Sequence, residues 1–144
     1  MARMEVTIPT DLIRKLEKLG DKGDEISKKM LTSGAKILHA KVDSNLKKNL
    51  YTNRTYEEDY PTGALEKSLT IDKPKKNKSG NHSINIYFKG NDSKGVANSM
   101  KARAMESGTS RQQKKPFVRP AVEETKEEVN AEMQRIFDNE ISNL

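Results

Sequence analysis

A long stretch of helical periodicity most constrains how this chain can fold. Between Asp24 and about Leu50, apolar residues recur at spacings of three and four, at Leu31, Ala35, Leu38, Val42 and Leu46. This pattern is typical of a helix with one buried face. About 25 residues at 1.5 Å each make a rod of about 38 Å, so we predict a helix that spans a sheet, with Asp24 as its N-cap. Gly34 within it indicates either close approach of another backbone or a tolerated defect.

Two further helices are predicted on either side of this one. We expect Thr10 to cap a helix that ends at Gly20, with an apolar face made by Leu12, Ile13, Leu16 and Leu19. The last helix is predicted to begin near Pro120, because a proline lacks an N–H that would have no partner at a first helical position. Its apolar face is predicted to carry Val122, Val129, Met133, Ile136 and Phe137, with Ile141 as an extension.

The middle of the chain has strand patterns. Ser83 to Phe88 alternates apolar and polar residues, which predicts a half-buried strand. Leu65, Leu69 and Ile71 indicate a second strand, and the turn-rich segment 72–81 predicts a hairpin with a long basic tip. The spacing from Val96 to Ala104 favours a short helix, with a strand as the alternative. The predicted class is therefore α+β, a small antiparallel sheet packed by long N-terminal and C-terminal helices.

Length and composition set limits on organisation. A chain of 144 residues fits one domain over residues 1–144, with exposed loops at 51–63, 73–81 and 108–116. Only 33% of the residues are hydrophobic, so we expect a thin core and a surface that needs partners. The absence of cysteine excludes disulfides and thiolate metal sites. No run of about 18 apolar residues and no secretory signal pattern occurs, which predicts a soluble chain without a membrane partner.

The sequence gives little support for an enzyme. His39 and His82 fall in different predicted elements, without further ligands at metal-site spacing. Ser107, Thr109 and Ser110 lack the strand–turn–helix setting and nearby base of a nucleophile, and no phosphate-binding glycine loop is present. We therefore predict no catalytic, metal or cofactor site.

The charge distribution leaves two interpretations open. From residue 121 onward, seven acidic and two basic residues give a net charge of −5, which leaves +11 on residues 1–120. The basic body either contacts nucleic acid or pairs with acidic surfaces, within one subunit or between subunits. The candidate contacts with a DNA backbone are on two loops, at Lys73, Lys75, Lys76, Lys78, Lys114 and Lys115. A small cytosolic, non-sequence-specific DNA-binding protein is thus the alternative function.

A compact motif precedes the last helix. Glu106 comes before a Gly-Thr turn at residues 108 and 109, and Pro-Phe-x-Arg-Pro-Ala follows at residues 116–121. Gly108 is free to adopt positive φ, and the two prolines restrict the backbone around Phe117, which is predicted to be a packing anchor. We expect Arg119 to donate a forked pair of hydrogen bonds to a carboxylate, with Glu106 as the candidate. The motif resembles the hallmark of a head–tail joining or tail-completion (minor tail) protein family of long-tailed bacteriophages and prophages.

This resemblance implies a non-enzymatic structural protein of the virion, assembled in the cytoplasm of the bacterial host. It implies a ring, hexameric in a tail, at the head-proximal tail end or neck. There the ring would contact the head connector or head-closure protein and tail tube or tail terminator proteins, around the channel for genomic DNA. The candidate interface residues are Tyr51, Tyr56, Tyr60, Glu106, Gly108, Thr109, Arg111, Phe117 and Arg119. For the motif, a purely fold-fixing role and direct subunit contact both remain open, as do an interface role and folding back onto the domain for the tyrosines.

Overall fold

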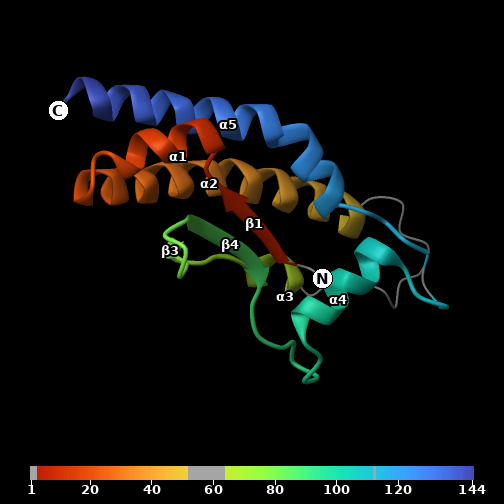
Figure 1. Ribbon diagram of the computed structural model, residues 1–144. Coiled ribbons are helices and arrows are strands. Elements are labelled where there is room, and N and C mark those ends of the chain that lie inside the picture. The colour runs from red at the N-terminus through yellow and green to blue at the C-terminus, as the bar shows by residue number, and fades with distance from the viewer. Residues whose placement is uncertain (1–2, 52–63, 112) are drawn as a thin grey trace.

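The chain is built in layers, with one helix between a helical layer and a sheet (Figure 1). A computed structural model describes residues 3–51, 64–111 and 113–144. Helix α2 (Asp21–Tyr51) lies between α5 (Val118–Ser142) and the sheet, and α1 (Thr10–Glu17) packs on α2. The short helices α3 (Ala64–Ser68) and α4 (Asn98–Ser107) contact each other, and α4 lies at one end of the molecule. The predicted α+β class is confirmed.

Strand β4 (His82–Phe88) is the centre of the antiparallel sheet. On one side it pairs with β1 (Arg3–Thr7), with Met4 opposite Ile86. On the other it pairs with β2 (Leu69–Ile71) and with β3 (Lys75–Lys76). The predicted hairpin with a basic tip is thereby confirmed, and its tip contains β3. Strand β1 was not predicted, and it forms an edge of the sheet because its other side has no strand among the described residues.

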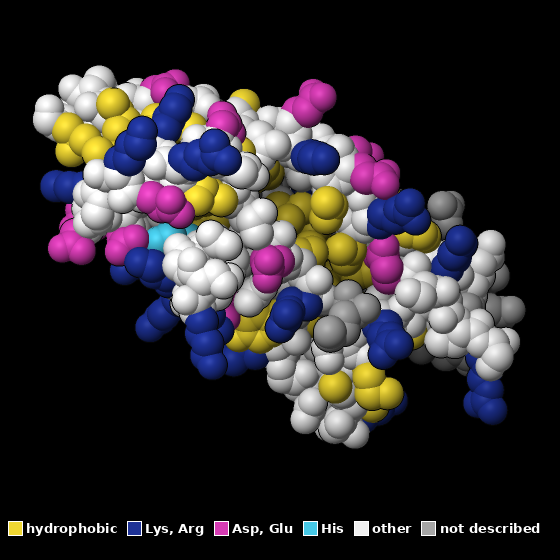
Figure 2. Space-filling model, viewed as in Figure 1, with side chains coloured by type: hydrophobic (Ala, Val, Ile, Leu, Met, Phe, Trp, Pro, Cys, Tyr) yellow, Lys and Arg dark blue, Asp and Glu magenta, His cyan; other side chains and the backbone are white. Residues whose placement is uncertain are grey.

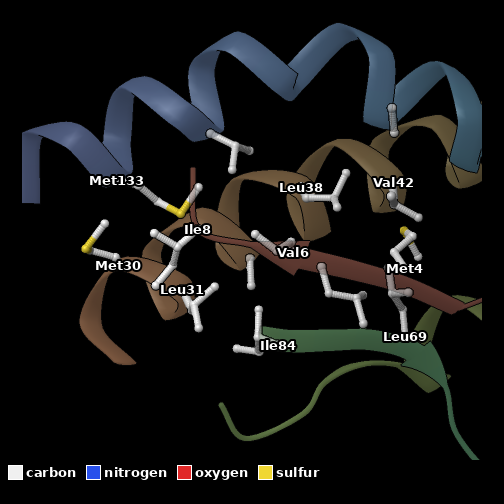
Figure 3. Packing of buried hydrophobic residues seen from close by; sticks show 14 of the residues in the cluster. Met4, Val6, Ile8, Met30, Leu31, Leu38, Val42, Leu69, Ile84 and Met133 are labelled. Atoms are coloured by element: carbon white, nitrogen blue, oxygen red, sulfur yellow. The ribbon is translucent and has the colours of Figure 1, made fainter. Parts of the chain in front are cut away.

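The core lies on both faces of α2 (Figure 3). The apolar stripe predicted for this helix is confirmed, because all five of its residues are buried: Leu31, Ala35, Leu38, Val42 and Leu46. Gly34 is explained by close packing, because a Cβ there would lie 3.1 Å from Cγ1 of Val129 and 3.7 Å from Cγ1 of Val6. The neighbours that approach it are side chains of α5 and β1, not another backbone.

Two predicted N-caps are wrong, and the last helix begins slightly before Pro120. Thr10 is the first residue of α1 rather than its cap, and the N-cap position is held by Pro9 without a side-chain hydrogen bond. Helix α2 begins at Asp21, so Asp24 lies in its first turn and its carboxylate binds other groups. Helix α5 begins at Val118, which makes Pro120 its third residue. The missing N–H of Pro120 still costs nothing there, because the first turn of a helix has no intrahelical acceptor for it.

Two predicted apolar patterns also differ from the structure. Residues 64–68 form helix α3, so the strand expected from Leu65 is limited to residues 69–71. On α5, the buried residues follow a spacing of four, at Ala121, Thr125, Val129, Met133 and Phe137. Val122 and Ile141 are 40% and 37% exposed and lie outside this face. Ile136 is partly buried against the core, as predicted. The short helix predicted from Val96 is α4, which starts at Asn98.

Candidate functional site

The motif before α5 forms a polar junction between α4 and α5. Helix α4 ends beside Gly108, whose φ of 78° fits the predicted reversal. From the last turn of α4, one carboxylate oxygen of Glu106 accepts hydrogen bonds from the N–H groups of Phe117 and Val118, each at 2.8 Å. The other oxygen accepts from the N–H of Arg119 at 3.1 Å. Glu106 therefore caps the N-terminus of α5, where free N–H groups and the helix dipole favour a negative charge.

Helix α2 fastens the segment that connects α4 to α5. The side-chain amide of Asn49 donates to the carbonyl oxygen of Lys115 at 2.8 Å, and that of Asn45 donates to the carbonyl oxygen of Phe117 at 3.2 Å. The N–H of Lys115 in turn donates to the carbonyl oxygen of Met105 at 2.7 Å. Neither asparagine is predicted from the sequence to take part in the site. Their spacing of four places them on one helix face, which is a weak signal without knowledge of what that face meets.

Phe117 anchors the junction in the core. Its side chain is fully buried and packs edge-on against Phe88 of β4, with ring centroids 5.9 Å apart and an interplanar angle of 71°. The predicted role of Phe117 as a packing anchor is confirmed. The forked pair predicted between Arg119 and Glu106 is wrong, because the guanidinium of Arg119 contacts Glu123 one turn along α5, with Nε 3.2 Å from Oε1. Only the backbone of Arg119 binds Glu106.

The other predicted contact residues lie around this junction or outside the described part. Thr109 and Arg111 are exposed in the loop after α4, where the Thr109 hydroxyl accepts a hydrogen bond from the N–H of Arg111 at 3.2 Å. Tyr51 is the last residue of α2. Tyr56 and Tyr60 lie outside the described residues. A role of these residues in subunit contact stays a prediction.

The lysines proposed to contact DNA separate into two groups. Lys73, Lys75, Lys76 and Lys78 belong to the β2–β4 hairpin, and Lys114 and Lys115 to the loop before α5, at the α4 end of the molecule. Two hairpin lysines have acidic partners, since Nζ of Lys75 lies 2.9 Å from Asp72 and Nζ of Lys76 lies 3.4 Å from Asp24. The two groups thus do not form one continuous basic surface on the described chain.

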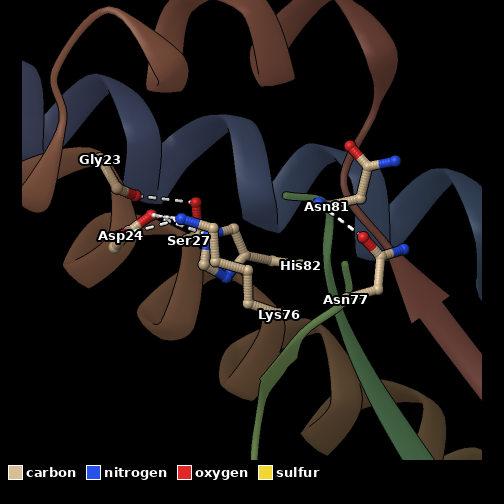
Figure 4. A network of polar contacts seen from close by, with 7 residues as sticks. All are labelled: Gly23, Asp24, Ser27, Lys76, Asn77, Asn81 and His82. Atoms are coloured by element: carbon tan, nitrogen blue, oxygen red, sulfur yellow. Dashed lines mark hydrogen bonds and ion pairs between the residues drawn. The ribbon is translucent and has the colours of Figure 1, made fainter. Parts of the chain in front are cut away.

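A second polar cluster lies where the hairpin meets the start of α2 (Figure 4). Oδ1 of Asp24 is 2.9 Å from Nε2 of His82 and 3.4 Å from Nζ of Lys76. The hydrogen bond to His82, followed by the charge of Lys76, lowers the pKa of the Asp24 carboxyl below its usual value. Beside it, the buried Ser27 hydroxyl donates to the carbonyl oxygen of Gly23 at 2.7 Å. These residues line a pocket of about 300 Å³, but the contacts are explained by fastening the hairpin to α2.

The described residues hold no cluster of potential metal ligands. His39 and His82 are bound separately, His39 to the carbonyl oxygen of Leu69 at 3.1 Å and His82 to Asp24. No group of three potential metal ligands occurs within residues 3–51, 64–111 and 113–144. Among the helices described, none has the length and apolar character required to cross a membrane.

Comparison with known proteins identifies the family. A family described as "Bacteriophage HK97-gp10, putative tail-component" matches residues 10–91, which is more than half of the chain. The chain belongs to this HK97 gp10-like family of phage tail components. Neither the curated proteins nor the solved structures give a match. The family assignment therefore rests on the segment from α1 to just beyond β4.

The matched segment and the α4–α5 junction are different parts of the HK97 gp10-like chain. The match ends at residue 91, before α4, whereas the motif that resembles tail-completion proteins spans residues 104–121. The family match therefore does not test the motif, whose resemblance to tail-completion proteins stays a prediction. The matched segment and the junction are nevertheless in contact. Helix α2 binds the junction by hydrogen bonds and β4 packs against it, and both elements lie inside the matched segment.

Proposed function

We propose that this chain is a non-enzymatic structural protein that forms a ring at the head-proximal end of the tail or in the neck. There it completes the tail and joins it to the head connector or head-closure protein, and genomic DNA passes through the ring. The observation that carries this proposal is the family match over residues 10–91 to phage tail components. The resemblance of residues 104–121 to tail-completion proteins supports the proposed position at the head-proximal end of the tail.

The architecture supports an assembly role. Helix α5 is acidic, whereas the segment from Lys94 to the start of α5 is basic, with Lys94, Arg103, Arg111, Lys114 and Lys115 making no ion pair among the described residues. Opposite charges on separate surfaces of one chain favour contacts in which one copy binds the next head-to-tail. Such heterologous contacts close into a ring when the rotation per copy fits, as a channel around DNA requires.

Light scattering tests this proposal directly. The mass of the purified chain is measured over a range of concentrations, with and without tail tubes purified from phage particles, and the samples are imaged by negative-stain microscopy. We expect a discrete mass several times that of one chain, or copies that cap one end of the tubes. A chain that stays monomeric at every concentration and ignores the tubes overturns the proposal.

The same preparation tests the alternative of a DNA-binding protein. Binding of a short DNA duplex is measured at low and at moderate salt. Neutralisation of phosphates by the loop lysines predicts an affinity that falls steeply with salt, because each contact releases counterions. A monomer with that salt dependence, which loses DNA when Lys73 and Lys78 are both replaced by Ala, would establish the alternative and exclude the ring.

A further inference from the structure

The surface has an exposed apolar projection at α4. Met100 on α4 is 66% exposed, and Val96 just before the helix is 41% exposed. These are the two most exposed large hydrophobic residues described apart from the C-terminal Leu144. Figure 2 shows hydrophobic side chains gathered at this end of the molecule. Arg103 follows Met100 by three residues, is exposed, and forms no ion pair with a described residue. Side chains three apart share one face of a helix, so the projection combines an apolar tip with a free positive charge.

A groove with matching properties lies elsewhere on the molecule, between β1 and α5. It has a volume of about 430 Å³ and is lined by Val6 and Ile8, by Leu38 of α2, and by Val122 and Val129 of α5. A hollow with hydrophobic walls is visible between these elements in Figure 2. Glu5 lies on its β1 side, exposed and without an ion pair among the described residues. Lys126 lies on its α5 side.

The groove also borders an unpaired strand edge. In β4 the carbonyl oxygen of Asn85 accepts from the N–H of Asp72, on the β2 side. Backbone groups of successive strand residues point to alternate sides, so β4 bonds β1 through residues 84 and 86, which pair with Val6 and Met4. The N–H and C=O groups of Glu5 therefore point away from β4. Exposed strand edges promote unwanted pairing and are commonly covered in natural proteins. The outer edge of β1 is therefore a surface that we expect another chain to cover.

We propose that a second copy of this chain covers the groove, with Met100 and Val96 of one copy inserted between β1 and α5 of the next. In that contact Arg103 of one copy meets Glu5 of its neighbour. The projection and the groove are different surfaces of one chain, so the contact is heterologous and propagates from copy to copy. This inference rests on the proposed ring and specifies which surfaces form it.

A charge-swap experiment tests the contact. Arg103→Glu and Glu5→Arg are each expected to weaken self-association roughly tenfold or more, since like charges then face each other across the interface. The double variant Arg103→Glu with Glu5→Arg restores opposite charges at every interface, and we expect most of the association to return. The matched control combines Glu5→Arg with Arg111→Glu, an exposed base beyond α4, and it restores nothing. Circular dichroism of each variant shows whether it folds.

Cross-linking gives a second measurement that needs no loss of function. The chain has no cysteine, so an introduced pair has no background. Met100→Cys with Val122→Cys is expected to give a ladder of disulfide-linked oligomers under mild oxidation. The control pairs Met100→Cys with Ile141→Cys, which has a similar exposure on the same helix, 37% against 40% for Val122, and it gives no ladder.

The outcomes separate this inference from the proposed function. A wild-type chain that never associates overturns both. A wild-type ring that persists in Arg103→Glu, or that yields no ladder with the cysteine pair, overturns only the inference, because the ring then uses other surfaces. Charge-swap rescue together with the ladder supports it.

Discussion

Replacement of Glu106 by Ala is expected to destabilise the fold strongly. The carboxylate accepts three backbone hydrogen bonds at the start of α5, at 2.8, 2.8 and 3.1 Å. Loss of an N-cap side chain costs about 0.5–2 kcal/mol, and a hydrogen bond to a charged group contributes about 1.5–3 kcal/mol. The three bonds share one carboxylate and the donor of Arg119 is exposed, so they do not add fully. We expect a loss of about 2–4 kcal/mol in the free energy of unfolding.

Urea denaturation followed by circular dichroism measures this loss. With a slope of about 2 kcal/mol per molar urea, the midpoint should fall by about 1–2 M. Glu106→Gln retains one acceptor oxygen but loses the charge, so about half of the effect is expected. The matched control is Glu123→Ala, which removes an exposed ion pair with Arg119 and should change the free energy by less than about 0.5 kcal/mol. Each variant is measured at two protein concentrations, because self-association also stabilises a fold.

The capping interpretation is refuted if Glu106→Ala unfolds at the same urea concentration as the wild type and as Glu123→Ala. The contacts at the α5 N-terminus would then be replaced by water at no cost. A loss as large in Glu106→Gln as in Glu106→Ala would show instead that the charge carries the whole effect.

Three further changes test other parts of the structure. Gly23→Ala should lower the free energy of unfolding, measured by urea denaturation, by more than about 2 kcal/mol, because a Cβ there would lie 2.0 Å from the carbonyl oxygen of Leu16, a backbone atom. Gly34→Ala should cost less, because a Cβ there meets only side chains. Phe117→Ala should cost about 3–5 kcal/mol by the same assay, since the ring is fully buried, and near-wild-type stability would contradict the packing described. Asp24→Asn should lower stability at about pH 5, and the difference from the wild type should shrink as the pH falls below about 3.8. A carboxyl with a lowered folded pKa contributes stability above its unfolded pKa, near 3.8, and loses it as the pH falls through the folded value. A difference that stays constant as the pH falls would contradict this.

The sequence predicted the elements whose signals are local and long. Helix α2 was predicted because its apolar period persists over about 25 residues, and β4 because six residues alternate without interruption. Strand β1 was missed although Met4 and Val6 alternate with polar neighbours, because it pairs with a strand far along the chain, where Ile86 lies opposite Met4. Residues 64–67, Ala-Leu-Glu-Lys, are strong helix formers, and this local preference explains why α3 forms where the apolar spacing indicated a strand.

The site was predictable in its location but not in its contacts. The Gly108 reversal and the buried Phe117 follow from residue type. The role of Glu106 does not follow from residue type. Capping rules concern the residue just before a helix, whereas the side chain that caps α5 lies eleven positions before Phe117. The wrong pairing of Arg119 has the opposite origin, because its partner Glu123 lies one turn along the same helix and needs no tertiary contact.

The junction and the proposed subunit contact are connected through rigidity. The projection at Met100 is carried by α4, and the groove is formed by β1 and α5, so the angle between successive copies depends on how α4 is held against α5. Glu106 and Asn49 fix that relation, one from α4 to the α5 backbone and one from α2 to the connecting segment. A heterologous contact closes into a ring only at certain rotations and otherwise extends as an open filament. We therefore expect Asn49→Ala, whose partner carbonyl is exposed and whose loss should leave the fold intact, to broaden the distribution of oligomer masses without abolishing association. A single sharp mass equal to that of the wild type would show that the angle is set elsewhere.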